Sequence, residues 1–166
     1  MNAATVFYQA LSGVSFTLLG LWFGVIQFAH GGWRSDPARH RATLHIALHF
    51  FLPGTMALGS LLSGDSDGGL LWRAAFVLGG VIGCAESVTF LRVRSGVPGL
   101  GVQTLRLLDP LLYALVVVVA FVPGPVGALT PLQMEGVLTG LLFLTGLCYV
   151  WLAFAERERV GPSGRR

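Results

Sequence analysis

Residues 70–91 read LLWRAAFVLGGVIGCAESVTFL, and only Arg73 and Glu86 in this run are charged. A helix needs about 20 apolar residues to cross the roughly 30 Å hydrocarbon core of a bilayer, and the run has that length. The stretch therefore predicts a membrane-spanning helix with one ionisable side chain, Glu86, well inside it.

The composition of the whole chain agrees with this prediction. The chain has 166 residues, of which 54% are hydrophobic and 11% are charged, and its mean hydropathy is +0.72. A soluble domain usually carries about 25% charged residues. Together with 23 glycines, this low charge excludes a soluble fold, a disordered chain and a disulfide scaffold. We attribute the basic pI near 9.4 to membrane topology and expect no nucleic-acid partner.

Four further apolar runs accompany the first. The predicted spans cover residues 6–29, 42–62, 70–91, 101–122 and 131–155. Each run is long enough to cross the hydrocarbon core as a helix. The sequence therefore predicts an all-α, polytopic integral membrane protein, a bundle of five transmembrane helices formed by residues 1–155. Residues 156–166 are expected to form a mobile cytoplasmic tail.

The arginines indicate an orientation. The second connection holds Asp65 and Asp67 with only Arg73 nearby, and the fourth holds no charge. The other arginines are in the first connection, the third connection and the tail: Arg34, Arg39, Arg41, Arg92, Arg94, Arg106, Arg157, Arg159, Arg165 and Arg166. Under the positive-inside rule, this alternation predicts an N-terminus outside and a C-terminus in the cytoplasm. We expect a multi-pass protein of the cell (plasma) membrane.

Local signals mark the helix starts and the irregular points. Asp36 before Pro37 is typical of an N-cap followed by the first helical position. The segment Thr130-Pro131-Leu132-Gln133 has the pattern of a capping box. Pro53 and Pro110 fall inside spans and predict kinks. We expect the fourth span to continue as one helix through Pro110, because a helix that began there would be too short to cross.

Several polar side chains fall at one depth. His45 and His49 are one helical turn apart in the second span, and Glu86 lies in the third. Counting 1.5 Å per residue from the predicted cytoplasmic boundary places His49 about 10 Å deep and Glu86 roughly 8 Å deep. Asp109 enters the fourth span from the same side, with Tyr113 one turn further in. The sequence therefore places these groups in the cytoplasmic third of the bundle.

Three interpretations of this polar set remain open. In the first, Glu86 and Asp109 are neutralised by arginine or histidine and only stabilise the bundle. In the second, the carboxylates and histidines form a proton or cation pathway. In the third, His45 and His49 bind a metal or haem, which would need another ligand from a different helix. The spacing alone assigns no metal and no cofactor.

Small residues form faces on three predicted helices. Such faces let membrane helices approach closely, either within a bundle or between subunits around an axis. In the second case, Gln9 and Gln27 of the first span would face a wet pore. The candidate packing positions are Gly79, Gly83, Gly20, Gly24, Gly136 and Gly140.

These observations lead to two functional hypotheses. The first is a homo-oligomeric proton or cation channel or transport protein, in which Glu86 is the key group and His49 and Asp109 modulate it. The alternative is a non-conducting membrane subunit or scaffold that packs against a partner through its glycine faces. No nucleophile motif or phosphate-binding loop occurs, so we expect no enzyme activity. The expected partners are the lipid bilayer and a second copy of the chain, and no other protein partner is identified.

Overall fold

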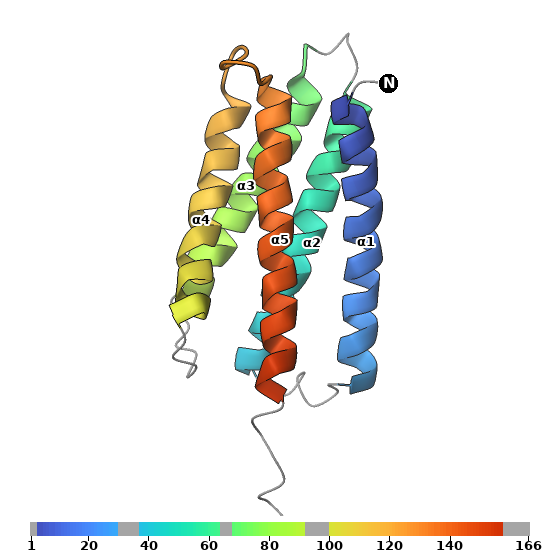
Figure 1. Ribbon diagram of the computed structural model, residues 1–166, viewed down its shortest axis with the longest axis vertical. Coiled ribbons are helices and arrows are strands. Elements are labelled where there is room, and N and C mark those ends of the chain that lie inside the picture. Colours follow the sequence, from blue (N-terminus) through green and yellow to red (C-terminus); the bar gives the residue numbers. More distant parts are fainter. Residues whose placement is uncertain (1–2, 30–36, 64–67, 92–99, 158–166) are drawn as a thin grey trace, which may run out of the picture.

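The described part of the chain is all-helical. The structure is a computed structural model that describes residues 3–29, 37–63, 68–91 and 100–157. Figure 1 shows the helices side by side, with successive helices running in opposite directions. Each is long and apolar enough to cross a membrane, which confirms the predicted all-helical fold with five candidate spans and indicates a multi-pass membrane protein. The helices are α1 (Ala3–Ala29), α2 (Pro37–Leu62), α3 (Leu70–Leu91), α4 (Leu100–Ala120) and α5 (Pro131–Arg157).

The helix bounds follow the predicted spans with small extensions. α3 covers 70–91, as predicted. α2 begins at Pro37 rather than at residue 42, because proline suits the first helical position and the polar residues after it continue the helix beyond the apolar run. The proposed N-cap Asp36 and the predicted tail beyond Arg157 lie outside the described residues.

Side chains fix the turn between α4 and α5. The Gln133 N–H donates to Thr130 Oγ1 over 3.3 Å, and the Thr130 N–H donates to Gln133 Oε1 over 2.9 Å. This reciprocal pair confirms the predicted capping box. At the end of α4, the Arg73 guanidinium donates to the carbonyls of Ala120 and Val122. These carbonyls lie at the helix end, where the helix itself supplies no partners.

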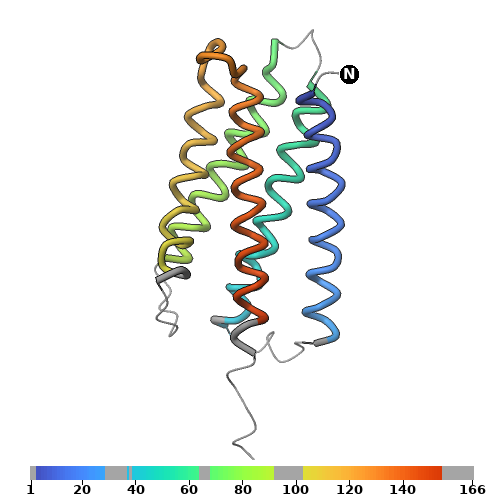
Figure 2. The backbone as a smooth tube through the Cα atoms, in the orientation of Figure 1, coloured from blue at the N-terminus to red at the C-terminus, as the bar shows by residue number. Residues whose placement is uncertain are grey.

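Both proline-containing helices continue through the proline. Figure 2 shows α2 and α4 as unbroken tubes, which agrees with the expectation for α4. Proline has no N–H, so the carbonyl four residues earlier loses its helical partner. For Pro53 this is the carbonyl of His49. α2 therefore has a freed backbone acceptor close to its two buried histidines.

α2 is the central helix of the bundle. It contacts α1, α3 and α5, and 61% of its most apolar window is buried, against 28–33% for the other helices. It also has the lowest mean hydropathy of the five. A polar helix is stable in a membrane when protein covers its polar groups. The central position of α2 therefore carries its histidines into the interior.

The small residues of α3 pack inside the chain. Gly79 and Gly83 are both buried. A Cβ atom added to Gly79 would stand 2.7 Å from the side chain of Met56 in α2. A Cβ atom added to Gly83 would overlap the ring of Tyr113 in α4. These glycines therefore allow α3 to approach its two neighbours.

The small residues of α1 have a different environment. A Cβ atom added to Gly20 or Gly24 would meet no atom within 4 Å. Gln9 and Gln27 are exposed on the same helix. This face of α1 therefore has no neighbour at Gly20 and Gly24 within the described part of the chain.

Candidate functional site

Polar side chains from four helices meet inside the bundle. His45 and His49 come from α2, Glu86 from α3, Asp109 from α4 and Tyr149 from α5, and we call these five residues the polar cluster. Both histidines and Asp109 are 0–1% exposed, and the Glu86 side chain is 13% exposed. Their positions along the four helices place the cluster toward the end of the bundle where α2 and α4 begin.

Asp109 is the centre of the cluster. The Tyr149 hydroxyl donates to Asp109 Oδ2 over 2.6 Å. His45 Nε2 lies 3.3 Å from the same oxygen, and His49 Nε2 lies 3.3 Å from Asp109 Oδ1. One carboxylate therefore faces three side chains that come from two other helices.

The second nitrogen of each histidine is held separately. His49 Nδ1 lies 2.9 Å from the carbonyl oxygen of His45. A carbonyl only accepts, so His49 Nδ1 carries the hydrogen and donates it. His45 Nδ1 lies 2.5 Å from Glu86 Oε2. Both imidazole rings are thus oriented through Nδ1, and both direct Nε2 toward Asp109.

Aromatic rings surround the histidines. The Phe90 ring stacks on His45 with 3.9 Å between centroids, and the Tyr149 ring lies 4.8 Å from His45. The Tyr113 ring lies 5.8 Å from His49. These rings replace water around the polar atoms, which strengthens the electrostatic interactions within the cluster.

Local sequence explains how the helices deliver these groups. Residues four apart in a helix lie on one face, so His45 and His49 point the same way. A Cβ atom added to Gly146 of α5 would stand 2.8 Å from His49 Cβ. Glycine at this position therefore lets α5 approach α2 closely enough for Tyr149 to reach Asp109.

The cluster contains most of the polar residues singled out from the sequence. His45, His49, Glu86 and Asp109, which the sequence placed in one third of the bundle, are in contact, and Tyr113 lies beside them. The two glutamines of α1 are exposed and lie outside the cluster, to which α1 contributes no residue.

Sequence reasoning missed Tyr149. The available signal was a tyrosine in an apolar span, because a buried tyrosine hydroxyl usually finds a hydrogen-bond partner. Tyr149 is 6% exposed and its hydroxyl is bonded to Asp109. Its place in the cluster also depends on the rotation of α5, which periodicity alone did not show.

A second buried carboxylate lies toward the opposite end of α5. Glu135 is 0% exposed, and neither of its oxygens has a hydrogen bond within the described part of the chain. Thr139 and Thr145 are buried on the same helix and donate to main-chain carbonyls. Glu135 and Tyr149 are about 21 Å apart along the helix axis at 1.5 Å per residue. The buried face of α5 is therefore polar over much of its length.

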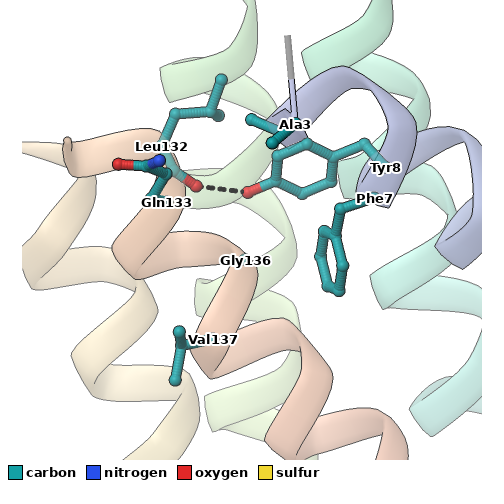
Figure 3. Close-up of a pocket in the computed structure, with 8 residues that line it drawn as sticks. Ala3, Phe7, Tyr8, Leu132, Gln133, Gly136 and Val137 are labelled. Carbon is teal, nitrogen blue, oxygen red and sulfur yellow. Dashed lines mark hydrogen bonds between the residues drawn. The ribbon is translucent and has the colours of Figure 1, made fainter. Parts of the chain in front are cut away.

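A groove between α1 and α5 is a different kind of site. Its volume is about 230 Å³. In Figure 3 the Tyr8 hydroxyl of α1 points to the Leu132 carbonyl of α5, and this hydrogen bond is 2.7 Å long. Gly136 leaves room for Phe7 at this contact, whereas Gly140 lies farther from the same ring. The groove has no ionisable carboxylate, imidazole or thiol, so we base the functional argument on the polar cluster. Its lining is Ala3, Ala4, Phe7, Tyr8, Leu132, Gln133, Gly136 and Val137.

Three residues of the cluster have the arrangement of metal ligands. His45, His49 and Asp109 each offer one ligand atom, and these atoms lie within 4.8 Å of one another. The histidines come from α2 and Asp109 from α4, so the third candidate ligand comes from a different helix than the two histidines.

Comparison of the chain with protein-family models, curated proteins and solved structures gives no match. The functional argument therefore depends on the geometry of the polar cluster.

Proposed function

We propose that the protein transports cations, either protons or a metal ion, across the membrane through the polar cluster. The observation that carries this proposal is the chain of contacts from Glu86, which is partly exposed, through His45 to the fully buried Asp109. An ionised group at the centre of a membrane helix costs about 2.5–3.5 kcal/mol on insertion scales. A bundle that assembles several such groups in one place is suited to holding a positive charge there.

A purely structural role accounts less well for the unpaired atoms. Networks that only stabilise a fold gain most when every buried polar atom is satisfied. Within the described residues, both histidine Nε2 atoms, Asp109 Oδ1 and Glu86 Oε1 are buried without a hydrogen bond. Such atoms are available to a cation that enters the cluster.

The buried face of α5 supplies a route beyond the cluster. It carries Thr145, Thr139 and then Glu135 toward the other end of the bundle. The distance of about 21 Å from Tyr149 to Glu135 covers most of the roughly 30 Å hydrocarbon core. Leu142 is 0% exposed and interrupts this face. In our proposal, Leu142 is the apolar barrier that a cation must pass.

The predicted orientation completes this proposal. With the arginine-rich ends of the helices in the cytoplasm, the polar cluster would face the cytoplasmic side of the plasma membrane and Glu135 the outer side. Self-association would use the uncovered face of α1, which carries Gln9 and Gln27.

Flux measurements test the proposal. The purified chain is reconstituted into liposomes that contain a pH-sensitive dye or a zinc-sensitive dye, and a potassium gradient with valinomycin sets the potential. We expect flux of at least one of the two cations above that of protein-free vesicles. Glu86→Gln should lower it at least tenfold, and His40→Ala, at an exposed histidine of the same helix as the cluster histidines, should leave it unchanged. Equal flux with parent protein and empty vesicles, or with parent and Glu86→Gln, would contradict the proposal.

A scaffold role is the second candidate, and the environment of α1 favours it. Gly79 and Gly83 already pack against α2 and α4 inside the chain, whereas a Cβ atom added at Gly20 or Gly24 would meet no atom within 4 Å. A partner helix would therefore pack on α1. In this case Gly20→Leu should abolish a crosslinked complex in membranes, while Leu21→Ala, at a neighbouring exposed position, should preserve it. A crosslinking pattern that is the same in the parent and in Gly20→Leu would exclude this face.

A further inference from the structure

The two histidine Nε2 atoms and the Asp109 carboxylate face one another with no hydrogen bond between them. Each Nε2 atom lies 3.3 Å from an Asp109 oxygen, yet neither Nε2 has a hydrogen-bond partner in the part of the chain that the structure describes. All three side chains are at least nine-tenths buried. This arrangement requires an explanation, because unpaired buried polar atoms are rare in folded proteins.

The Nδ1 contacts define what the Nε2 atoms can do. His49 donates its Nδ1 hydrogen to a carbonyl oxygen, so in the neutral ring Nε2 is an acceptor with a free lone pair. When His45 donates its Nδ1 hydrogen to the Glu86 carboxylate, its Nε2 is an acceptor as well. Asp109 is also an acceptor when it is ionised. Three acceptors that face one another in a low dielectric repel, unless a proton or a metal ion lies between them.

We propose that His45 Nε2, His49 Nε2 and Asp109 bind a divalent transition-metal ion, with Zn²⁺ as the representative ion. The inference rests on the proposed function and deepens it by naming the cation. Zinc binds histidine nitrogen and carboxylate oxygen at about 2.0–2.2 Å in tetrahedral sites. Neighbouring ligand atoms of such a site are about 3.3–3.6 Å apart, as tetrahedral geometry requires for bonds of that length. Each histidine Nε2 lies 3.3 Å from one of the two Asp109 oxygens, and one ligand atom from each of the three residues lies within 4.8 Å of the other two.

The surroundings of the three ligands also fit a metal. A histidine that binds a metal usually donates its other ring N–H to a carboxylate or to a backbone carbonyl. Here His45 contacts Glu86 and His49 contacts a main-chain carbonyl. A ligating carboxylate is in turn hydrogen-bonded, as Asp109 is by Tyr149. Each of the three ligands therefore has the outer contact that metal ligands have.

Charge and space favour a single small ion. The Asp109 and Glu86 carboxylates together balance the two positive charges of the metal, so the loaded cluster is neutral inside the membrane. Two imidazole ligands favour zinc and its first-row neighbours over Ca²⁺ and Mg²⁺, which prefer oxygen. Haem does not fit, because Phe90 stacks on His45 and Tyr149 crowds the same ring. Three protein ligands leave a fourth position, which is the arrangement of zinc sites that exchange a ligand.

Metal binding can be measured without a transport assay. The purified full chain, with no affinity tag and after chelator treatment, is titrated with Zn²⁺ against a competing dye and with Co²⁺, whose visible bands report tetrahedral coordination. We expect one ion per chain. His49→Ala should lose stoichiometric binding, and Glu86→Gln, which removes the negative charge of an outer contact, should weaken it about 10–100-fold. His40→Ala, at an exposed position of α2, should bind as the parent does.

Further measurements distinguish loss of the metal site from loss of folding, and failure of the metal site from failure of the proposed transport. Helix content and gel-filtration volume show whether each variant folds, and the graded effect of Glu86→Gln tests the site even if His49→Ala does not fold. Absence of stoichiometric binding to the parent, or equal binding to the parent and to both variants, would overturn the inference. Proton flux without zinc binding would overturn the metal site and leave the proposed transport intact. Zinc binding without flux would support the site and overturn the proposed transport.

Discussion

Gly83 offers a sharp test of how the helices position the cluster. It is buried in α3 against the ring of Tyr113, and that ring lies beside His49. An added methyl group would overlap the Tyr113 ring, which is 1% exposed and enclosed by neighbours. Gly83→Ala is therefore expected to force α3 and α4 apart rather than to be absorbed by a flexible side chain.

The magnitude follows from two opposing effects. Alanine is a better helix former than glycine by about 1 kcal/mol, whereas overpacking a buried contact costs about 1–3 kcal/mol. Gly20→Ala, on the open face of α1, carries the first effect without the second. The helix-forming contribution cancels between the two variants, so Gly83→Ala should be less stable than Gly20→Ala by about 1–3 kcal/mol.

Unfolding in mixed micelles measures this difference. The purified variants are titrated with increasing mole fractions of dodecyl sulfate, and helix content and tryptophan fluorescence report unfolding. Replacing Tyr113 with leucine in the parent and in Gly83→Ala completes a double-mutant cycle. Without the ring, the loss of stability caused by Gly83→Ala should be smaller by about 0.5–3 kcal/mol. The reasoning is refuted if Gly83→Ala equals Gly20→Ala in stability, or if the cycle shows no coupling.

Three further predictions concern single interactions and use the same unfolding assay. Tyr149→Phe removes the 2.6 Å bond to Asp109 and should destabilise the protein by about 1–2 kcal/mol. The matched control Tyr113→Phe, whose hydroxyl has no partner among the described residues, should change the stability little, and equal effects would contradict the assignment. Thr130→Ala breaks the capping box of α5 and should lower the stability by about 1 kcal/mol. The control is Thr17→Ala, at an exposed threonine in α1. A loss of stability no larger than that of the control would argue against the cap. Arg73→Met removes the hydrogen bonds to the end of α4 and should speed amide exchange at residues 120–122, and unchanged exchange there would show that the cap does not hold this end.

The membrane class and the helix bounds could be predicted because each depends on local properties. Within a bilayer every backbone N–H and C=O must be satisfied internally, so a long apolar run becomes a helix whatever its neighbours are. The capping residues at Thr130 and Gln133 also act within one turn. Helix rise converts sequence position into a level along the bundle, which is why His49 and Glu86 could be placed at similar levels, with Asp109 entering from the same side, before any contact was known.

Contacts between helices depend on the rotation of each helix about its axis and on its neighbours. A row of glycines lets another helix approach closely but does not identify that helix. A Cβ atom added at Gly83 would overlap the Tyr113 ring, whereas one added at Gly20 would meet no atom within 4 Å. Glu135 has the sequence position of an acid near a helix start, yet it is fully buried. Tyr149 carried no distinctive pattern and nevertheless contacts Asp109.

The sequence by itself therefore determined five helices that are long and apolar enough to cross a membrane, and it indicated which third of the bundle holds the polar cluster. Only the tertiary structure decided that the Nε2 atoms of His45 and His49 point toward the carboxylate of Asp109. Span formation is decided residue by residue by hydrophobicity and backbone hydrogen bonding. The direction of a side chain across a bundle depends on packing between helices, which in a membrane is a matter of shape and close contact rather than of hydrophobic pattern.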